Sequence, residues 1–209
     1  KSAYKEGMVL GDIWGLQFDR FLTEDDFNAD GSLKAGLPDQ TKVFPAGYQF
    51  APGDVLYKDL DNNGEIVKQT NTNDKGDLSV IGNALPRLQF GLNLDAAWKG
   101  FDISMFFQGV AKRKLWAAGN QVLPGFTTGE PFYKGAEDYW TPENTDAFYP
   151  RPMDYKQSAS GNYSVNDRYL LNMAYLRLKT FTVGYSLPKV WLSKFKVQGL
   201  RVYFTGENL

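Results

Sequence analysis

The chain has 209 residues and a formal net charge of -1, which is long enough for one domain with a sizeable core. Its balanced charge and lack of a long Lys/Arg-rich block predict no nucleic-acid partner. It contains no cysteine and no histidine, which excludes disulfides, thiolate nucleophiles and catalysis by Ser-His-Asp or Cys-His groups within these residues.

The N-terminal quarter of the chain predicts short strands followed by loop. Residues 8–21 are rich in β-prone side chains, with Gly11 and Gly15 as interruptions. Thr23 precedes three acidic residues, a pattern that predicts an N-cap and a short helical turn. Residues 28–55 are rich in Gly, Pro, Asp and Asn, which predicts a loop.

A calcium-loop motif is the clearest chemical signature. Residues 59–66 read Asp-Leu-Asp-Asn-Asn-Gly-Glu-Ile, which places oxygen ligands at alternate positions before a glycine. The predicted ligands are Asp59, Asp61 and Asn63. Asp74 and Asp77 are the candidates to complete a shell around Ca²⁺. The alternative interpretation is a polar Asn-Gly turn that binds no ion.

Two alternating segments, 88–98 and 101–107, predict an antiparallel hairpin. Side chains alternate faces along a strand, so the pattern gives the hairpin one apolar and one polar face. The apolar face carries Phe90, Leu92, Leu94, Ile103 and Met105. The polar face carries Gln89, Asn93, Asp95, Asp102 and Gln108. The first segment reaches the roughly 9–11 residues that a transmembrane β-strand requires.

Residues 111–173 predict a long loop punctuated by proline and glycine. Loops of this length are commonly functional when they occur in compact proteins. Their aromatic side chains are candidate contacts for a cargo molecule or a covering partner, and we select Trp116, Tyr139 and Trp140 for these roles. Internal packing of the loop is the alternative role for the same rings.

Further strands are expected over 174–187 and 199–209. In the first, apolar side chains fall on even positions at the start and on odd positions from Phe181 onward. Such a change of phase indicates either a β-bulge or a crossing from the loop base into a lipid band. We favour the crossing, with residues 181–187 facing lipid.

Long and short connections alternate along the chain. Long polar stretches precede residue 88 and span 111–173, whereas the connections at 99–100 and 188–198 are short. Bacterial β-barrels place short turns on the periplasmic side and long loops outside. The pattern predicts an all-β fold, an antiparallel transmembrane β-barrel segment with long extracellular loops. A soluble β-sandwich is the alternative.

Several short motifs of a known family are spread over nearly the whole chain. In the first half they are Pro52-Gly53-Asp54, Tyr57-Lys58-Asp59, Lys99-Gly100-Phe101-Asp102 and Phe106-Phe107-Gln108-Gly109. In the second half they are Tyr139-Trp140-Thr141-Pro142, Asp167-Arg168, Tyr175-Leu176-Arg177-Leu178-Lys179, Gly184-Tyr185 and Glu207-Asn208-Leu209. In order and spacing they resemble the C-terminal part of a SusC/RagA-type, TonB-linked outer-membrane protein.

This resemblance implies a place in a barrel of roughly 22 strands in the cell outer membrane. It implies TonB-dependent import of nutrients, oligosaccharides foremost and peptides as the second class, with a SusD-like surface lipoprotein as partner and membrane lipid around the barrel. Residues 1–87 would then be a strand end and extracellular loop, 88–110 a hairpin, 111–173 an extracellular loop and 174–209 a hairpin. We expect the plug, the TonB-contacting region and the final strand to lie outside the 209 residues.

No enzyme activity is predicted for the chain. Neighbouring carboxylates such as Glu137/Asp138 and Asp25/Asp26 do not form the separated pair, placed across a substrate, that glycoside hydrolysis needs. The alternative to import is a soluble, calcium-dependent carbohydrate-binding β-domain. Burial of the apolar hairpin face would favour that alternative, and its exposure would favour the barrel.

Overall fold

The computed structural model describes residues 7–68, 74–126, 133–153 and 161–209. Strands and turns dominate, which confirms an all-β chain. No helix in the described part is long and apolar enough to cross a membrane. The chain divides into two compact units. Unit 1 comprises Lys1–Leu85 and Lys114–Leu171, and unit 2 comprises Pro86–Arg113 and Asn172–Leu209.

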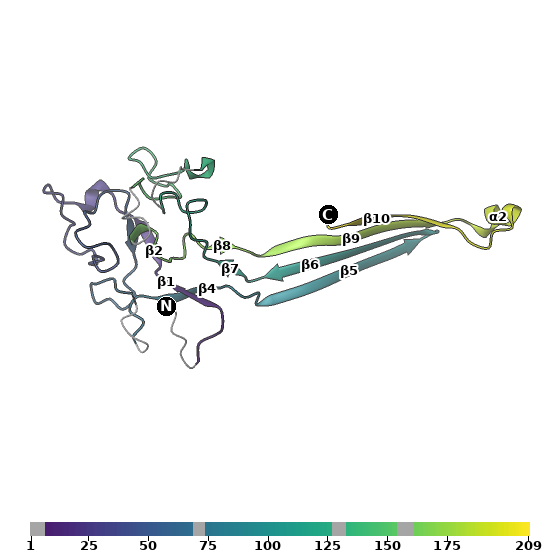
Figure 1. The fold of residues 1–209 in the computed structure, drawn as a ribbon, viewed down its shortest axis with the longest axis horizontal. Helices are drawn as coiled ribbons and strands as arrows, with labels where there is room; N and C mark the ends of the chain where they lie inside the picture. The colour runs from purple at the N-terminus through teal and green to yellow at the C-terminus, as the bar shows by residue number, and fades with distance from the viewer. Residues whose placement is uncertain (1–6, 69–73, 127–132, 154–160) are drawn as a thin grey trace. The chain divides into compact units, whose positions relative to one another are not determined.

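Unit 2 is built on a four-stranded antiparallel sheet with the strand order β10-β9-β6-β5 (Figure 1). Its strands are β5 (Leu88–Trp98), β6 (Phe101–Ala111), β9 (Tyr175–Ser186) and β10 (Arg201–Glu207). The predicted hairpin is present, because Trp98 pairs with Phe101 across a two-residue turn. Lys99 and Gly100 in that turn have φ of 47° and 90°, as the type I′ turns favoured in tight hairpins require.

One face of this sheet is apolar across all four strands. Directly opposed residues of neighbouring strands place their side chains on the same face. Three of the resulting rows are Trp98–Phe101–Tyr185–Val202, Ala96–Ile103–Val183–Phe204 and Leu94–Met105–Phe181–Gly206. The polar side chains predicted for the other face, such as Asn93 and Asp102, occupy the alternate positions.

The apolar face is open rather than buried. Phe90, Leu92 and Leu94 are 42%, 48% and 44% exposed, and Ile103 and Met105 are half-buried. Both hydrophobic core clusters found among the described residues belong to unit 1. The sheet of unit 2 is therefore a single layer without a hydrophobic core of its own.

The change of phase in β9 is a β-bulge, which corrects the interpretation favoured from the sequence. Phe106 pairs with Thr180, but the next residue of β6, Phe107, pairs with Leu178, so Lys179 is an extra residue in β9. The insertion brings Leu178 onto the same face as Phe181. The apolar face therefore continues through the whole of β9 instead of changing sides.

Among the described residues, two short two-stranded ladders lie within unit 1, and a third ends at Asn172, the first residue of the second stretch of unit 2. They join β1 (Asp12–Gly15) to β4 (Ser79–Asn83), β2 (Phe18–Phe21) to β3 (Val55–Tyr57), and β7 (Lys114–Leu115) to β8 (Leu171–Asn172). In the part of unit 1 that the structure describes, the 3-10 turns are η1 (Glu24–Asp26) and η2 (Lys134–Ala136). The predicted helical turn is confirmed as η1, where the Asp26 carboxylate accepts hydrogen bonds from the backbone N–H and hydroxyl of Thr23.

A buried carboxylate, that of Asp54, connects distant parts of unit 1. It accepts hydrogen bonds from the Arg151 guanidinium at 2.9 Å, the Tyr48 hydroxyl at 2.8 Å and the Asn162 amide at 3.0 Å. The Arg151 backbone N–H also donates to the Gly53 carbonyl at 3.0 Å. The two stretches predicted as separate loops are thus packed together by one satisfied ionic network.

Candidate functional site

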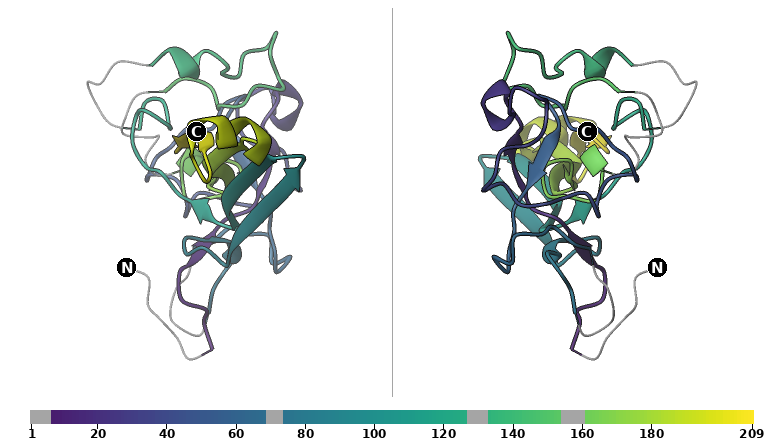
Figure 2. Two further views of the ribbon diagram at one scale, coloured as in Figure 1. Left: turned by 90° about the vertical axis from the view of Figure 1, so that its right-hand side faces the viewer. Right: turned by 90° about the vertical axis from the view of Figure 1, so that its left-hand side faces the viewer.

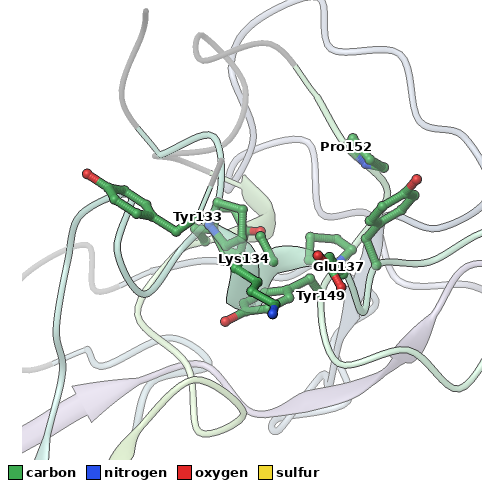
Figure 3. A pocket seen from close by; sticks show the side chains of 10 residues that line it. Tyr133, Lys134, Glu137, Tyr149 and Pro152 are labelled. Carbon is green, nitrogen blue, oxygen red and sulfur yellow. The ribbon is translucent and has the colours of Figure 1, made fainter. Parts of the chain in front are cut away.

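A pocket of about 410 Å³ opens in unit 1 (Figure 3). It is lined by Pro124, Tyr133, Lys134, Ala136, Glu137, Tyr139, Tyr149, Pro150, Pro152 and Tyr163. Its walls are mostly aromatic rings and prolines, and one cation and one anion stand at the same short turn, η2. Predominantly apolar walls with a few polar groups are typical of pockets for small ligands, and this volume lies within their usual range.

Local hydrogen bonds fix the wall that carries Tyr139 and Tyr149. These two residues form an isolated parallel bridge, and the Tyr149 N–H donates to the Asp138 carbonyl at 3.0 Å. The Asp138 carboxylate accepts from the backbone N–H of Phe148 and from the side chain of Asn144. The Asp138 carboxylate therefore has a structural role, because its hydrogen bonds close the 138–149 loop.

Arginine contacts hold the same loop from two sides. Arg151 places Pro150 and Pro152 through its pairing with Asp54. Arg168 donates to the carbonyl oxygens of Ala147 and Phe148 at 2.6 and 2.9 Å. The pocket wall is therefore held in place by charge-assisted hydrogen bonds.

Two of the pocket tyrosines, Tyr149 and Tyr163, are neutral hydrogen-bonding groups. Burial raises the pKa of Tyr149, with a further contribution from Asp138, and burial together with the neighbouring Tyr149 and Tyr57 raises the pKa of Tyr163. Tyr163 packs edge-on against the buried Tyr169, whose pKa burial also raises. Near neutral pH these side chains offer ring faces and hydroxyl groups without adding negative charge.

The three aromatic residues selected from the sequence lie in different surroundings. Tyr139 is 40% exposed and lines the pocket. Trp140 is 7% exposed and belongs to the larger core of unit 1, where a Cβ on Gly53 would lie 2.5 Å from its ring. Trp116 packs, half-buried, against the smaller core around Leu123. The geometry supports a contact role for Tyr139 and internal packing, the stated alternative, for the two tryptophans.

The predicted calcium motif folds as a tight acidic turn, with Gly64 at a φ of 86°. Carboxylate oxygens of Asp59, Asp61 and Asp77 lie within 4.8 Å of one another. Asp77, one of the two candidates to complete the shell, is the one that the fold brings to the motif. Asp74 instead accepts the Gly76 N–H at 3.0 Å. Three hard oxygen donors at this spacing fit the chemistry of Ca²⁺.

The oxygens of this cluster also serve the turn itself. Asp59 accepts the N–H groups of Asn62 and Gly64, both at 2.7 Å, and these bonds, the Gly64 bond foremost, lower its pKa. Asn63, predicted as the third ligand, accepts the Glu65 N–H at 2.8 Å. Desolvation and the nearby carboxylates of Asp77 and Asp59 raise the pKa of Asp61. The arrangement is therefore compatible with an ion-free turn as well as with a metal site.

Sequence reasoning missed most of the pocket. Tyr133, Tyr149 and Tyr163 come from three stretches that converge only in the folded chain. Lys134 and Glu137 were visible as charges beside aromatic residues, but their distance from each other in space is set by η2. The density of tyrosines between residues 133 and 169 was the one available signal.

Two curated proteins show what the chain is similar to. It is 29% identical over 211 residues to TonB-dependent receptor P3 of Formosa agariphila, in an alignment covering 98% of this chain and 18% of that receptor. It is 34% identical over 153 residues to TonB-dependent receptor P26 of the same organism, covering 71% of this chain and 14% of the receptor. The chain is a homologue of TonB-dependent receptors. The resemblance found in its motifs is confirmed, and the relatives are receptors rather than enzymes.

Solved structures agree with this relationship at the level of fold. The match to a structure of the RagAB peptide transporter covers 95% of this receptor homologue and 18% of the transporter chain, with 17% identity and a TM-score of 0.56. The RagAB peptide importer in its closed-closed state matches 95% of this chain and 19% of its own, with 17% identity and a TM-score of 0.50. No protein-family model matches. The chain spans less than a fifth of the length of each of these relatives.

Proposed function

We propose that this chain is a segment of the transmembrane barrel of a SusC/RagA-type, TonB-dependent importer in the cell outer membrane. The barrel would have roughly 22 strands, as is usual for plugged outer-membrane transporters. The four strands of unit 2 would contribute to its wall, and unit 1 would form extracellular loops. A segment of this kind leaves unpaired edges on β5 and β10, which neighbouring barrel strands would cover.

The open apolar face of the sheet is the observation that carries this proposal. β5 and β6 have 11 residues each and β9 has 12, enough to cross a bilayer core at a tilt. Continuous apolar rows on one face and polar side chains on the other match a wall between lipid and lumen. In a soluble carbohydrate-binding domain, Phe90, Leu92 and Leu94 would be buried, whereas they are 42–48% exposed.

The loops of unit 1 support both cargo classes as proposals. A pocket of tyrosines and prolines suits the rings of an oligosaccharide and the apolar side chains of a peptide, which are the two cargo classes expected from the sequence. The structures named above are of a peptide importer, which supports testing peptides beside glycans. A SusD-like lipoprotein would cover the extracellular mouth, and TonB would act through the plug region.

Replacing Leu92 by Asp tests the orientation of the sheet. In the complete receptor, an acid on the lipid face should impair assembly, at a cost that stays below the roughly 2–4 kcal/mol of Lys or Arg at mid-bilayer. Asn93→Asp is the matched control, because it introduces the same side chain one residue away on the polar face. Heat-modifiable migration of the outer-membrane fraction measures assembly. Equal assembly of both variants would contradict the proposal.

We further propose that the cluster of Asp59, Asp61 and Asp77 binds Ca²⁺ in an extracellular loop. Support comes from the spacing of the three carboxylates and from the calcium-loop sequence around Gly64. Bound Ca²⁺ would neutralise the mutual repulsion of these groups and hold the turn of residues 59–66 against Asp77.

A further inference from the structure

The turn end of the unit 2 sheet carries a concentration of lysines without carboxylates. Residues 187–200 connect β9 to β10 and contain Lys189, Lys194 and Lys196 but no Asp or Glu. Lys99 lies in the neighbouring hairpin turn, at the same end of the sheet, because the Ser186 N–H donates to the Gly100 carbonyl at 2.8 Å. Figure 1 shows the connection, with α2 (Lys189–Leu192), beyond the ends of the strands, and the left view of Figure 2 shows it in yellow from the turn end.

The connection between β9 and β10 has one buried apolar side chain and two exposed ones. α2 begins after Pro188, continues into η4 (Ser193–Phe195) and ends at Lys196, which has a left-handed φ of 54°. Leu192 is buried, whereas Val190 and Trp191 are 76% and 60% exposed. The helical turn thus anchors itself through one side chain and presents two large apolar side chains outward.

A second tryptophan stands beside the hairpin turn. Trp98 is 70% exposed, and the Lys99 ammonium lies 4.7 Å from the centre of its ring. We call Trp98, Lys99, Lys189, Val190, Trp191, Lys194 and Lys196 the basic turn surface. It combines exposed indole rings with a local excess of positive charge.

No carboxylate in the described residues forms an ion pair with the lysines of this surface. Within the described residues, the ion pairs of unit 2 join Arg201 to Asp102 and involve none of these four lysines. Asp102, the carboxylate nearest in sequence to Lys99, is thereby already occupied. The surface keeps its net positive charge available for a partner.

We propose that the basic turn surface binds the headgroups of anionic phospholipids in the bilayer around the strands. The proposal rests on the proposed function, because it requires the sheet to stand in a membrane. Indole rings favour the boundary between hydrocarbon and water, and lysines at that boundary interact with lipid phosphates. Trp98, Val190 and Trp191 would enter the boundary region while the lysine ammonium groups meet the headgroups.

Photocrosslinking in the complete receptor tests this proposal. The photoreactive residue p-benzoylphenylalanine replaces Val190, and the adducts formed in outer-membrane vesicles are identified by mass spectrometry. We expect lipid adducts enriched in anionic headgroups over the bulk membrane, by about fivefold for each lysine that reaches a phosphate. The variant K189Q/K194Q/K196Q should return the adducts to bulk composition, while K112Q/K114Q, changed away from the turn, should not.

Crosslinking at a second position and at high salt separates failure of this proposal from failure of the barrel assignment. The same photoreactive residue at Leu92 reports on the lipid face of the sheet, so lipid adducts at Leu92 without them at Val190 would overturn the inference and leave the barrel intact. Absence of lipid adducts at both positions would overturn the barrel as well. High salt should reduce the anionic enrichment of the unmutated surface, since it screens exposed charges. Adducts with a protein, or with lipid in bulk proportion, would also overturn the inference.

Discussion

Arg201 on β10 reaches across β9 to pair with Asp102 on β6, with Nε of the arginine 3.0 Å from Oδ1 of the aspartate. Gly184 lies on the intervening strand directly opposite Asp102. A Cβ at Gly184 would stand 2.5 Å from the Arg201 guanidinium and 2.7 Å from the Asp102 carboxylate. A glycine at this crossing lets one ion pair connect three strands on the polar face of the sheet.

Gly184→Val should therefore separate Arg201 from Asp102. In the parent receptor, we expect Asp102→Asn and Arg201→Gln to be coupled, so that the double variant unfolds at a higher temperature than additivity gives. In the Gly184→Val background this coupling should vanish. Gly199→Val is the control, because a Cβ there meets no atom within 4 Å. If Asp102→Asn and Arg201→Gln remain coupled in the Gly184→Val background, Gly184 does not control the ion pair.

The ion pair of Arg20 and Asp26 should make unit 1 sensitive to acid. Two hydrogen bonds of 2.6 and 2.7 Å join the side chains, and the Arg20 bond, opposed by burial, lowers the pKa of Asp26 from 3.8 to about 2. A depressed folded-state pKa contributes stability that is present above pH 4 and lost as the pH falls toward 2. Asp26→Asn should cost about 1–2 kcal/mol near neutral pH, after allowance for the half-exposed arginine.

Unfolding midpoints measured from pH 7 to pH 2 check this prediction. The difference between the parent receptor and Asp26→Asn should shrink below pH 4. The neighbouring Asp25→Asn serves as the control, because its side chain is exposed and the Arg20 guanidinium bonds to Asp26 instead. A difference that stays constant over the whole pH range would contradict the assigned role of Asp26.

The sheet shows which features a sequence reveals locally. The period-two alternation and the Lys99-Gly100 turn were sufficient to predict β5 and β6, because both signals lie within one stretch of chain. The bulge at Lys179 was ambiguous, because a bulge is defined by the partner strand and a phase change has more than one cause. The correct interpretation depended on knowing that β6 lies beside β9.

The candidate pocket was harder to predict from sequence, because its residues come together through contacts between distant parts of the chain. The acidic turn is continuous in the chain, so Asp59 and Asp61 were identified directly, and Asp77 was one of two candidates. The pocket depends on the long-range pairing of Asp54 with Arg151, which are 97 residues apart. No local periodicity marks such a contact.

Calcium binding can be measured at the acidic cluster of unit 1. Titration of the complete receptor with millimolar Ca²⁺ should release heat and slow hydrogen exchange over residues 59–68. Asp77→Asn should abolish both effects, because it removes one of the three clustered carboxylates. Asp74→Asn is the matched control, since Asp74 lies outside the cluster. Absence of heat and of protection at millimolar Ca²⁺ would leave the ion-free turn as the correct interpretation.

Tyr139 and Trp140 are adjacent in sequence but should respond differently to substitution. Trp140→Ala removes a buried ring packed beneath Gly53 and should destabilise unit 1 by about 3–5 kcal/mol. The Trp140 indole N–H has no hydrogen-bond partner among the described residues, so Trp140→Phe should lose packing volume without losing a hydrogen bond and should cost less. Tyr139→Ala, at the exposed pocket wall, should leave folding intact.

Uptake and stability measured on the same receptor variants separate the two roles. With glycan and peptide mixtures as cargo, Tyr139→Ala should reduce uptake several-fold at an unchanged unfolding temperature, because it removes a ring face from the pocket. Trp140→Phe should retain uptake in proportion to the folded fraction. Loss of uptake in Trp140→Phe at full stability would assign cargo contact to the tryptophan. Unchanged uptake in Tyr139→Ala would remove this pocket from the import route, because the substitution opens its wall without disturbing the core behind it.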